Sequence, residues 1–202
     1  MARSRTQADH YTKRAQREGY PARSVYKLEE IQRKFSLIAP GNHVLDIGAS
    51  PGSWTLYAVR KLIGKSGAVV SVDLKPLGLN PIPKQVTFLQ GDAFEPPVSP
   101  SVIELGPYDV IISDAAPSTT GNRTVDTARS EQLAYQLLQL AEEALKPGGS
   151  LVLKLFQGGG ERDLLQQMGE VFDRAKSFKP KACRDNSFEL FLIGTGYGGT
   201  TP

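Results

Sequence analysis

The sequence contains very little cysteine or histidine: one cysteine, Cys183, and two histidines, His10 and His43, among 202 residues. A single cysteine excludes an internal disulfide and a multi-cysteine zinc site, and two histidines do not favour a histidine-built metal site, so we expect no metal. Apolar stretches are also short. None approaches the roughly 20 residues needed to span a bilayer, and no signal-peptide hydrophobic segment is present. We therefore expect a cytoplasmic, reducing environment and no membrane partner.

Charge is nearly balanced overall but unevenly distributed. The formal net charge is +3 at pH 7, yet residues 1–27 hold seven Lys/Arg and two acidic residues, a net +5, which leaves −2 for the remainder. A basic segment on a near-neutral body favours a polyanionic partner. The alternative is a solvated, partly disordered tail. We expect a single domain over residues 1–202, with residues 1–20 as a basic, loosely packed extension.

Beyond Pro40, short apolar runs alternate with helical patterns. Helices are expected at 53–63, 127–145 and 161–172. Strands are expected at 43–48, 68–74, 85–90, 108–114, 150–156, 175–179 and 188–194. Strands that alternate with helices predict an α/β fold with a mostly parallel sheet and helices on both faces.

A glycine-rich turn, Asp46-Ile47-Gly48-Ala49-Ser50-Pro51-Gly52-Ser53-Trp54, follows the first expected strand. Such a turn is the usual ligand cradle of an open α/β sheet. Dinucleotide sites use G-x-G-x-x-G, but here Ser50 stands in the place of the second glycine. Pro51 also lacks the N–H that a phosphate would need. The turn therefore suits a ligand that has no phosphate group.

Two further acidic residues follow expected strands. Asp73 lies 25 residues after Gly48, near the spacing of a carboxylate that binds ribose hydroxyls. Asp92 follows the third strand and could accept a hydrogen bond from an exocyclic amine. Taken alone, each acid could equally be a helix cap or a solvated loop residue. Together on one sheet edge they favour a ribose- and base-binding pocket without a phosphate contact, which describes S-adenosylmethionine.

Charged residues also interrupt apolar strands. Lys154 lies within Ser-Leu-Val-Leu-Lys-Leu-Phe, Glu189 lies within Phe-Glu-Leu-Phe-Leu, and Asp114 ends the fourth strand. Ammonium groups are rarely buried without a partner. Together with Lys27, which precedes the first strand, these residues can neutralise one another in one cleft. The alternatives are a strand-edge lysine that reaches water and an outward-facing glutamate.

Seven stretches, in order, resemble the FtsJ/RrmJ family of ribosomal RNA 2′-O-methyltransferases over nearly the full length: ARSVYKLEEI, VLDIGASPGSW, VVSVDL, FLQGD, ISDAAP, LVLKLFQGGG and NSFELFLIGTG. The resemblance implies a Rossmann-like S-adenosylmethionine-dependent methyltransferase fold, with a mostly parallel seven-stranded sheet and an antiparallel last strand. It implies a catalytic tetrad at Lys27, Asp114, Lys154 and Glu189. It implies cofactor contacts from Gly48, Gly52, Trp54, Asp73, Asp92 and Asp114.

The turn departs from the family pattern at one position. The family commonly has Ala-Pro-Gly-Gly-Trp where this chain has Ser-Pro-Gly-Ser-Trp at 50–54, so Ser53 replaces a glycine. A core role for Trp54 is the alternative to a cofactor contact.

The chemistry of ribose methylation supports the tetrad. A protonated 2′-hydroxyl is a poor nucleophile, so a base that removes its proton helps the attack. A free lysine, with a pKa of about 10.4, is mostly protonated at pH 7. We hypothesise that Lys154 is the general base, with a pKa lowered by burial and by Lys27, although nearby carboxylates act in the opposite direction. Asp114 would orient Lys154, and Glu189 would pair with Lys27.

Two basic groups predict where RNA binds: Arg14, Arg17 and Arg23 before Lys27, and Lys179 and Arg184 before the last strand. Residues 118–126 are expected to form a mobile lid beside the cofactor or a plain loop. The resemblance implies a uridine in the peptidyl-transferase A-loop of large-subunit ribosomal RNA as substrate, the large ribosomal subunit as partner, and a monomeric enzyme. Related enzymes modify tRNA or messenger RNA caps. A non-catalytic ribosome assembly factor and a nicotinamide-dependent oxidoreductase are alternatives from other classes.

Overall fold

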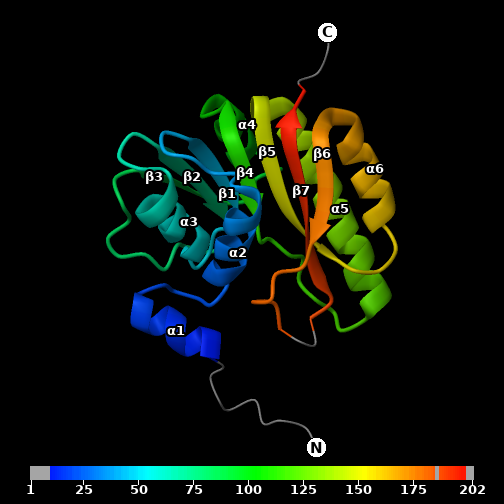
Figure 1. Cartoon of the computed structure of the whole chain (residues 1–202), viewed down its shortest axis with the longest axis horizontal. Coiled ribbons are helices and arrows are strands. Elements are labelled where there is room, and N and C mark those ends of the chain that lie inside the picture. Colours follow the sequence, from blue (N-terminus) through cyan, green and yellow to red (C-terminus); the bar gives the residue numbers. More distant parts are fainter. Residues whose placement is uncertain (1–9, 185–186, 199–202) are drawn as a thin grey trace, which may run out of the picture.

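The computed structural model describes residues 10–184 and 187–198 and contains one seven-stranded sheet, in the order β3-β2-β1-β4-β5-β7-β6 (Figure 1). The strands are β1 His43–Ile47, β2 Ala68–Asp73, β3 Val86–Gln90, β4 Tyr108–Ser113, β5 Leu145–Phe156, β6 Phe172–Phe178 and β7 Glu189–Tyr197. Strands β1 to β5 pair in parallel, whereas β7 runs antiparallel to both β5 and β6. The predicted mostly parallel sheet with an antiparallel last strand is confirmed.

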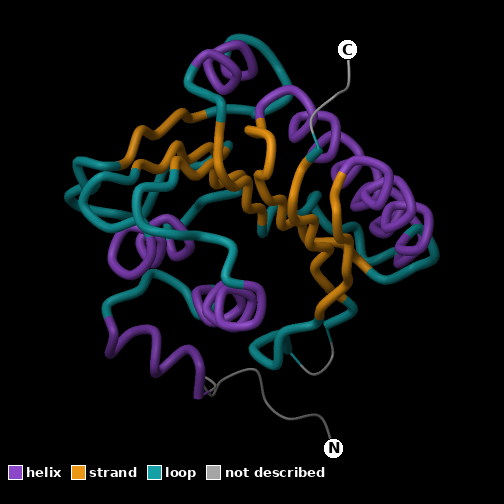
Figure 2. The backbone as a smooth tube through the Cα atoms, turned by 45° about the horizontal axis from the view of Figure 1, so that its top comes forward, coloured by secondary structure: helices purple, strands orange, loops and turns teal. Residues whose placement is uncertain are grey.

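Helices cover both faces of the sheet (Figure 2). They are α1 His10–Glu18, α2 Val25–Phe35, α3 Ser53–Tyr57 with a π-helical continuation at Ala58–Leu62, α4 Val98–Glu104, α5 Arg123–Ala144 and α6 Glu161–Val171. Leu28 and Ile31 of α2 and Trp54 of α3 join one core, and the buried apolar side chains of α4, α5 and α6 join the core on the opposite face. None of the helices in the described ranges is long and apolar enough to cross a bilayer.

The central strands are apolar on both sides because each of their faces meets helices. In β1, Val44 packs toward α2 and α3, while Leu45 packs toward α5; Val69 and Val70 repeat this in β2. All four side chains are 2% exposed or less. Successive side chains of a strand point to opposite faces, so a continuous apolar run marks a strand that is covered twice. This explains why the central strands are recognisable in the sequence.

The expected helix at 127–145 begins earlier, at Arg123, because Asn122 caps it. The Asn122 side-chain oxygen accepts hydrogen bonds from the backbone N–H groups of Thr124 at 3.1 Å and Val125 at 3.3 Å. Asp126, only 3% exposed, then accepts from Thr120 N at 2.7 Å and Gly121 N at 3.1 Å. Part of the expected 118–126 lid is therefore helical, and its loop is hydrogen-bonded to the first turn of α5.

The start of β5 was also placed wrongly. Leu145 already pairs with Tyr108, and Ser150 pairs with Val110, so a register shift takes up residues 146–149 between the two pairs. The expected strand at 150–156 therefore begins earlier, at Leu145, and the Lys-Pro-Gly-Gly sequence at 146–149 is an irregularity within it.

Three of the described helices, α1, α2 and α4, were not among those expected. Helix α2 buries Val25, Tyr26, Leu28 and Ile31, whose spacing is that of one helical face. This signal was present in the sequence, on the segment that carries Lys27. Helix α4 is short, contains Pro100 and follows a proline-rich stretch, so its sequence offers little helical pattern.

The N-terminal extension packs more closely than expected from residue 10 onward. Ala15 is 2% exposed and Tyr20 is 8% exposed, and both join a small core with Tyr26 and Leu56. Residues 1–9 of the expected extension lie outside the described residues.

Replacing Leu151 with alanine should destabilise the fold by roughly 2–5 kcal/mol, because its fully buried side chain leaves a cavity in the core beneath α5 and α6. Urea denaturation at pH 7 measures the change. Leu105→Ala is the matched control: Leu105 is 36% exposed, and its loss should cost less than about 1 kcal/mol. Equal losses for the two variants would contradict this description of the core.

Candidate active site

The alternation of side chains along the strands brings three charged residues to one face of the sheet. Lys154 follows Val152 by two residues, Asp114 follows Ile112 by two, and Glu189 precedes Phe191 by two. Val152, Ile112 and Phe191 all belong to the core beneath α2 and α3. A period of two therefore places the three charged residues on the face that α2 covers. Helix α2 supplies the fourth, Lys27.

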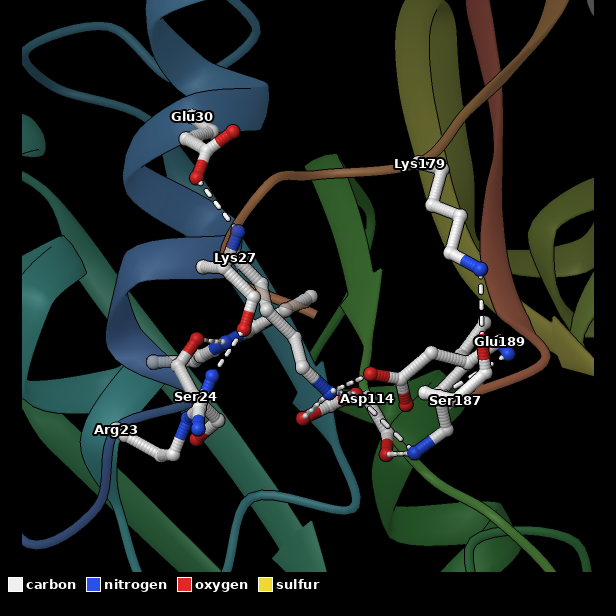
Figure 3. A network of polar contacts seen from close by, with 11 residues as sticks. Arg23, Ser24, Lys27, Glu30, Asp114, Lys179, Ser187 and Glu189 are labelled. Carbon is white, nitrogen blue, oxygen red and sulfur yellow. Dashed lines mark hydrogen bonds and ion pairs between the residues drawn. The ribbon is translucent and has the colours of Figure 1, made fainter. Parts of the chain in front are cut away.

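The four side chains form a connected network centred on Asp114. Figure 3 labels three of them, Lys27, Asp114 and Glu189. The Lys27 ammonium lies 3.2 Å from Asp114 Oδ1 and 2.9 Å from Glu189 Oε1. The Lys154 ammonium lies 3.1 Å from the same Asp114 Oδ1 and also donates to the Asp114 backbone carbonyl. Asp114 thus holds both lysines, and Glu189 holds Lys27 alone.

Burial makes this pairing necessary. The exposed fractions of the side chains are 12% for Lys27, 17% for Asp114, 9% for Lys154 and 12% for Glu189. Burial alone lowers the pKa of Lys27, but the charges of Asp114 and Glu189 outweigh it and raise that pKa above its usual value. Burial likewise raises the pKa of Glu189, but the Lys27 ammonium outweighs it and lowers that pKa. Lys27 and Glu189 are therefore both charged at neutral pH.

A cavity of about 690 Å³ opens at the carboxyl ends of the parallel strands. The predicted cofactor-contacting residues Gly48, Asp73, Asp92 and Asp114 all line it. Because Asp114 also belongs to the lysine–carboxylate network, the cavity and the network adjoin. Ligands of open α/β sheets bind at this edge.

The cavity's glycine turn is fixed by Asp73. Its two carboxylate oxygens accept hydrogen bonds from Ser50 N at 2.9 Å and Lys75 N at 2.8 Å. A Cβ atom at Gly48 would lie 2.7 Å from Ala115, so only glycine lets the turn approach the loop after β4. Asp92, on the far side, accepts from Phe94 N at 3.0 Å.

Asp46, the acidic residue with which the turn sequence begins, lies near the end of β1 and contacts α3. It is 1% exposed and accepts a hydrogen bond from Thr55 Oγ1 at 2.6 Å, and Thr55 also contacts Ser71 at 2.8 Å. Burial raises the pKa of Asp46 to about 7. Its place in an apolar strand was a signal of the same kind as that of Lys154.

Gly52 and Trp54 do not line the cavity. Gly52 has φ +106°, and a Cβ atom there would meet Leu79 at 2.7 Å. Trp54 is 3% exposed, stacks near Phe191 at 5.7 Å between ring centroids, and belongs to the core beneath α2 and α3. The structure thus places Trp54 in the core, the alternative that the sequence left open.

One wall of the cavity was missed. It is formed by one face of α5, through Arg129, Gln132, Leu133 and Gln136. These residues recur at helical spacing, three and four apart. The pattern was visible, but polar residues at this spacing are also typical of a helix face in water.

The five predicted RNA-binding residues differ in their surroundings. Arg14 is paired with Glu18 at 2.8 Å and Glu29 at 3.4 Å. Arg23 and Lys179 donate to backbone carbonyls, at Ala182 and Ser187 respectively. Arg17 and Arg184 are exposed. Among the described residues, no group of three or more His, Cys, Asp or Glu side chains is arranged to hold a metal ion.

Replacing Glu189 with glutamine should destabilise the protein by about 2 kcal/mol at pH 7, between the values typical of surface and buried ion pairs. The pKa of Glu189 is lowered in the folded state, so the stabilisation is present above about pH 4.5 and is lost as pH falls through the folded-state pKa. In urea denaturation from pH 7 to pH 3, the difference between wild type and variant should shrink on acidification.

Glu143→Gln, at an exposed position of α5, is the control and should change stability by less than about 0.5 kcal/mol throughout. A wild-type advantage over Glu189→Gln that stays constant down to pH 3 would rule out the charged pair as its source.

Comparison with known proteins agrees with this geometry. Residues 20–197 match the family model described as FtsJ-like methyltransferase. A ribosomal RNA large subunit methyltransferase E of Treponema denticola is 51% identical over 200 residues, which cover 98% of this chain and 100% of that protein. The protein of the same name from Syntrophobacter fumaroxidans is 48% identical, with coverage of 95% and 96%.

Solved structures show the same fold. A Plasmodium falciparum protein assigned as a ribosomal RNA methyltransferase has a TM-score of 0.76 and 26% identity, with coverage of 89% of this chain and 100% of that one. Human methyltransferase-like protein 13, solved with SAH, has a TM-score of 0.59 and 16% identity, with coverage of 89% and 80%. On the family model, the full-length relatives and the shared fold, this chain belongs to the FtsJ-like methyltransferase family.

Proposed function

We propose that this protein is an S-adenosylmethionine-dependent 2′-O-methyltransferase, acting on a uridine of large-subunit ribosomal RNA. The observation that carries the proposal is the position of Asp114, which lines the cavity and holds both lysines of the tetrad. A pocket for the methyl donor and a charged site for the acceptor hydroxyl therefore meet at one residue. The names of the T. denticola and S. fumaroxidans relatives support the choice of ribosomal RNA.

The cavity fits S-adenosylmethionine by size and chemistry. At about 690 Å³ it lies in the range of small-molecule sites. Asp73 would accept hydrogen bonds from the ribose hydroxyls, since each of its oxygens uses one lone pair for a backbone N–H. Asp92 would accept from the adenine amine. When bound, the cofactor supplies an electrophilic methyl group on a sulfonium.

Within the tetrad, Lys154 would accept the proton of the 2′-hydroxyl as the oxygen–methyl bond forms and the sulfur–methyl bond breaks. Asp114 orients the amino group of Lys154 through one carboxylate oxygen and its own backbone carbonyl. Lys27 remains an ammonium at neutral pH, and Glu189 holds it in place. The Lys154 amine must be neutral to accept this proton.

RNA binding would depend on the exposed cations near the tetrad. Arg17, Lys179 and Arg184 are the best placed of the five predicted residues to meet phosphates, because all three are exposed. Arg14 is already paired with two carboxylates and would contribute less. The ribose must reach a recessed amine, so a loop or single-stranded segment is the favoured substrate. We place the enzyme in the cytoplasm, as a single-domain monomer that acts on the large ribosomal subunit.

Lys154→Ala should lower the turnover of methyl transfer roughly 10²- to 10⁴-fold, the usual contribution of a general base. Labelled S-adenosylmethionine and large-subunit RNA or particles give the rate, and nuclease mapping places the label on the ribose. Lys146→Ala is the matched control. Lys146 pairs with Asp109 at 2.8 Å at the opposite end of the sheet, and its loss should leave turnover unchanged.

Near-normal turnover by Lys154→Ala would exclude the general-base role. Tight RNA binding by the wild type without any methyl transfer would point to a ribosome assembly factor instead.

Asp73→Asn should weaken S-adenosylmethionine binding about 10- to 100-fold, since a hydrogen bond to a charged group is worth about 1.5–3 kcal/mol. Isothermal titration calorimetry of the wild type and the variant measures this loss. Asp109→Asn serves as the control at the opposite end of the sheet. Titration with a nicotinamide dinucleotide should give no binding, and binding of that cofactor in place of S-adenosylmethionine would overturn the proposal.

A further inference from the structure

Two adjacent side chains at the start of α3, Ser53 and Trp54, form hydrogen bonds with the segment that leads into α2. Ser53 Oγ accepts a hydrogen bond from Ala22 N at 2.7 Å and donates to Ala22 O at 3.1 Å. Trp54 Nε1 donates to the backbone carbonyl of Ser24 at 2.8 Å. Ser53 is 1% exposed and Trp54 is 3% exposed, so water does not compete for these contacts. Residues 22–24 therefore have a fixed position relative to α3.

The Ser24 carbonyl also belongs to the turn that carries Lys27. The backbone N–H of Lys27 donates to it at 3.0 Å, so one carbonyl oxygen accepts from both the Trp54 indole and the Lys27 backbone. The indole ring reaches the other end of the same lysine through Phe191. Its centroid lies 5.7 Å from that of Phe191, and the Lys27 ammonium lies 5.7 Å from the centroid of the Phe191 ring. Trp54 thus shares a carbonyl partner with the Lys27 backbone, and through Phe191 it also packs near the Lys27 ammonium.

The other end of this connection is the cavity. Ser50 and Pro51 line it, and Gly52, with φ +106°, turns the chain directly into Ser53 and α3. Trp54 itself does not line the cavity. Its polar atom and its ring face are directed to the segment of Lys27 and to Phe191, so its contacts serve the tetrad side of the site.

We propose that Ser53 and Trp54 are positioning residues for Lys27, which join the cavity turn and the catalytic lysine into one rigid unit. This rests on the proposed function, because it assigns a role within the same methyl-transfer site. In this proposal Trp54 does not contact the methyl donor. Its indole N–H instead holds the turn that positions Lys27. Ser53 also has a role, because its hydroxyl makes both contacts to Ala22.

The test is Trp54→Phe, which keeps an aromatic ring and removes the N–H. Loss of one hydrogen bond that holds Lys27 should lower kcat roughly five- to tenfold, while the KM and calorimetric Kd for S-adenosylmethionine change less than twofold. Ser53→Ala should act in the same direction and provides a second variant if Trp54→Phe folds poorly. The control is Tyr108→Phe, which removes a buried hydrogen bond to Val102 O of 2.7 Å in the core on the opposite face. It should lower stability comparably and leave kcat unchanged.

A double-mutant cycle separates positioning from general damage. In the Lys27→Ala background, whose residual turnover is followed with labelled methyl donor, Trp54→Phe should have no further effect on kcat. Full additivity of the two substitutions would overturn the proposal, as would an effect of Trp54→Phe on cofactor Kd without an effect on kcat. Wild-type kcat in both Trp54→Phe and Ser53→Ala would also overturn it while the proposed function stands. Absence of methyl transfer by the wild type would instead refute the proposed function.

Discussion

Asp114 lies where the cavity adjoins the network of two lysines and two carboxylates. One of its carboxylate oxygens lies within 3.2 Å of both the Lys27 and the Lys154 ammonium groups. Two lysines in these recessed positions would be unfavourable without compensation, and two carboxylates supply equal and opposite charge. The rest of the site follows from this neutralisation, because the same residue forms part of the cavity wall. Under the proposed function, a methyl donor in the cavity and an acceptor beside the lysines would then meet at the same place.

The fold makes this convergence a consequence of ordinary strand geometry. Parallel strands end at one edge of the sheet, which collects Asp73, Asp92 and Asp114. Antiparallel pairing of β7 with β5 places Glu189 opposite Phe156 and Phe191 opposite Lys154. Glu189 therefore enters the same edge from the beginning of its strand, whereas the other carboxylates lie at strand ends. Because β7 is antiparallel, its first residue lies at the edge where the parallel strands end. A parallel strand would begin at the opposite edge and could not place its first residue in the site.

Much of this was predictable because charged residues in apolar strands are improbable without partners. Lys154, Glu189 and Asp114 were identified on that ground. The binding of ribose hydroxyls by Asp73 and the preference of the turn for a ligand without phosphate were inferred from spacing, Ser50 and Pro51, and they stay predictions. The resemblance to known methyltransferases then gave Lys27 its place. Details that depend on tertiary contacts could not be read in this way: the Asn122 cap that starts α5 early, the α5 wall at Arg129, and the pairing of Arg14 with Glu18 and Glu29. The burial of Trp54 likewise depends on α2, a helix that was overlooked.

The central claim is that the charges gathered at Asp114 perform ribose methylation on ribosomal RNA. The most direct measurement is a map of 2′-O-methyl groups across the ribosomal RNA of cells that lack this gene, complemented with the wild type or with a Lys154→Met variant. The account predicts that one methyl group, on a uridine of the large-subunit RNA, is missing, returns with the wild type and does not return with the variant. Retention of every methyl group in the deleted cells, or restoration of the missing one by Lys154→Met, would contradict it.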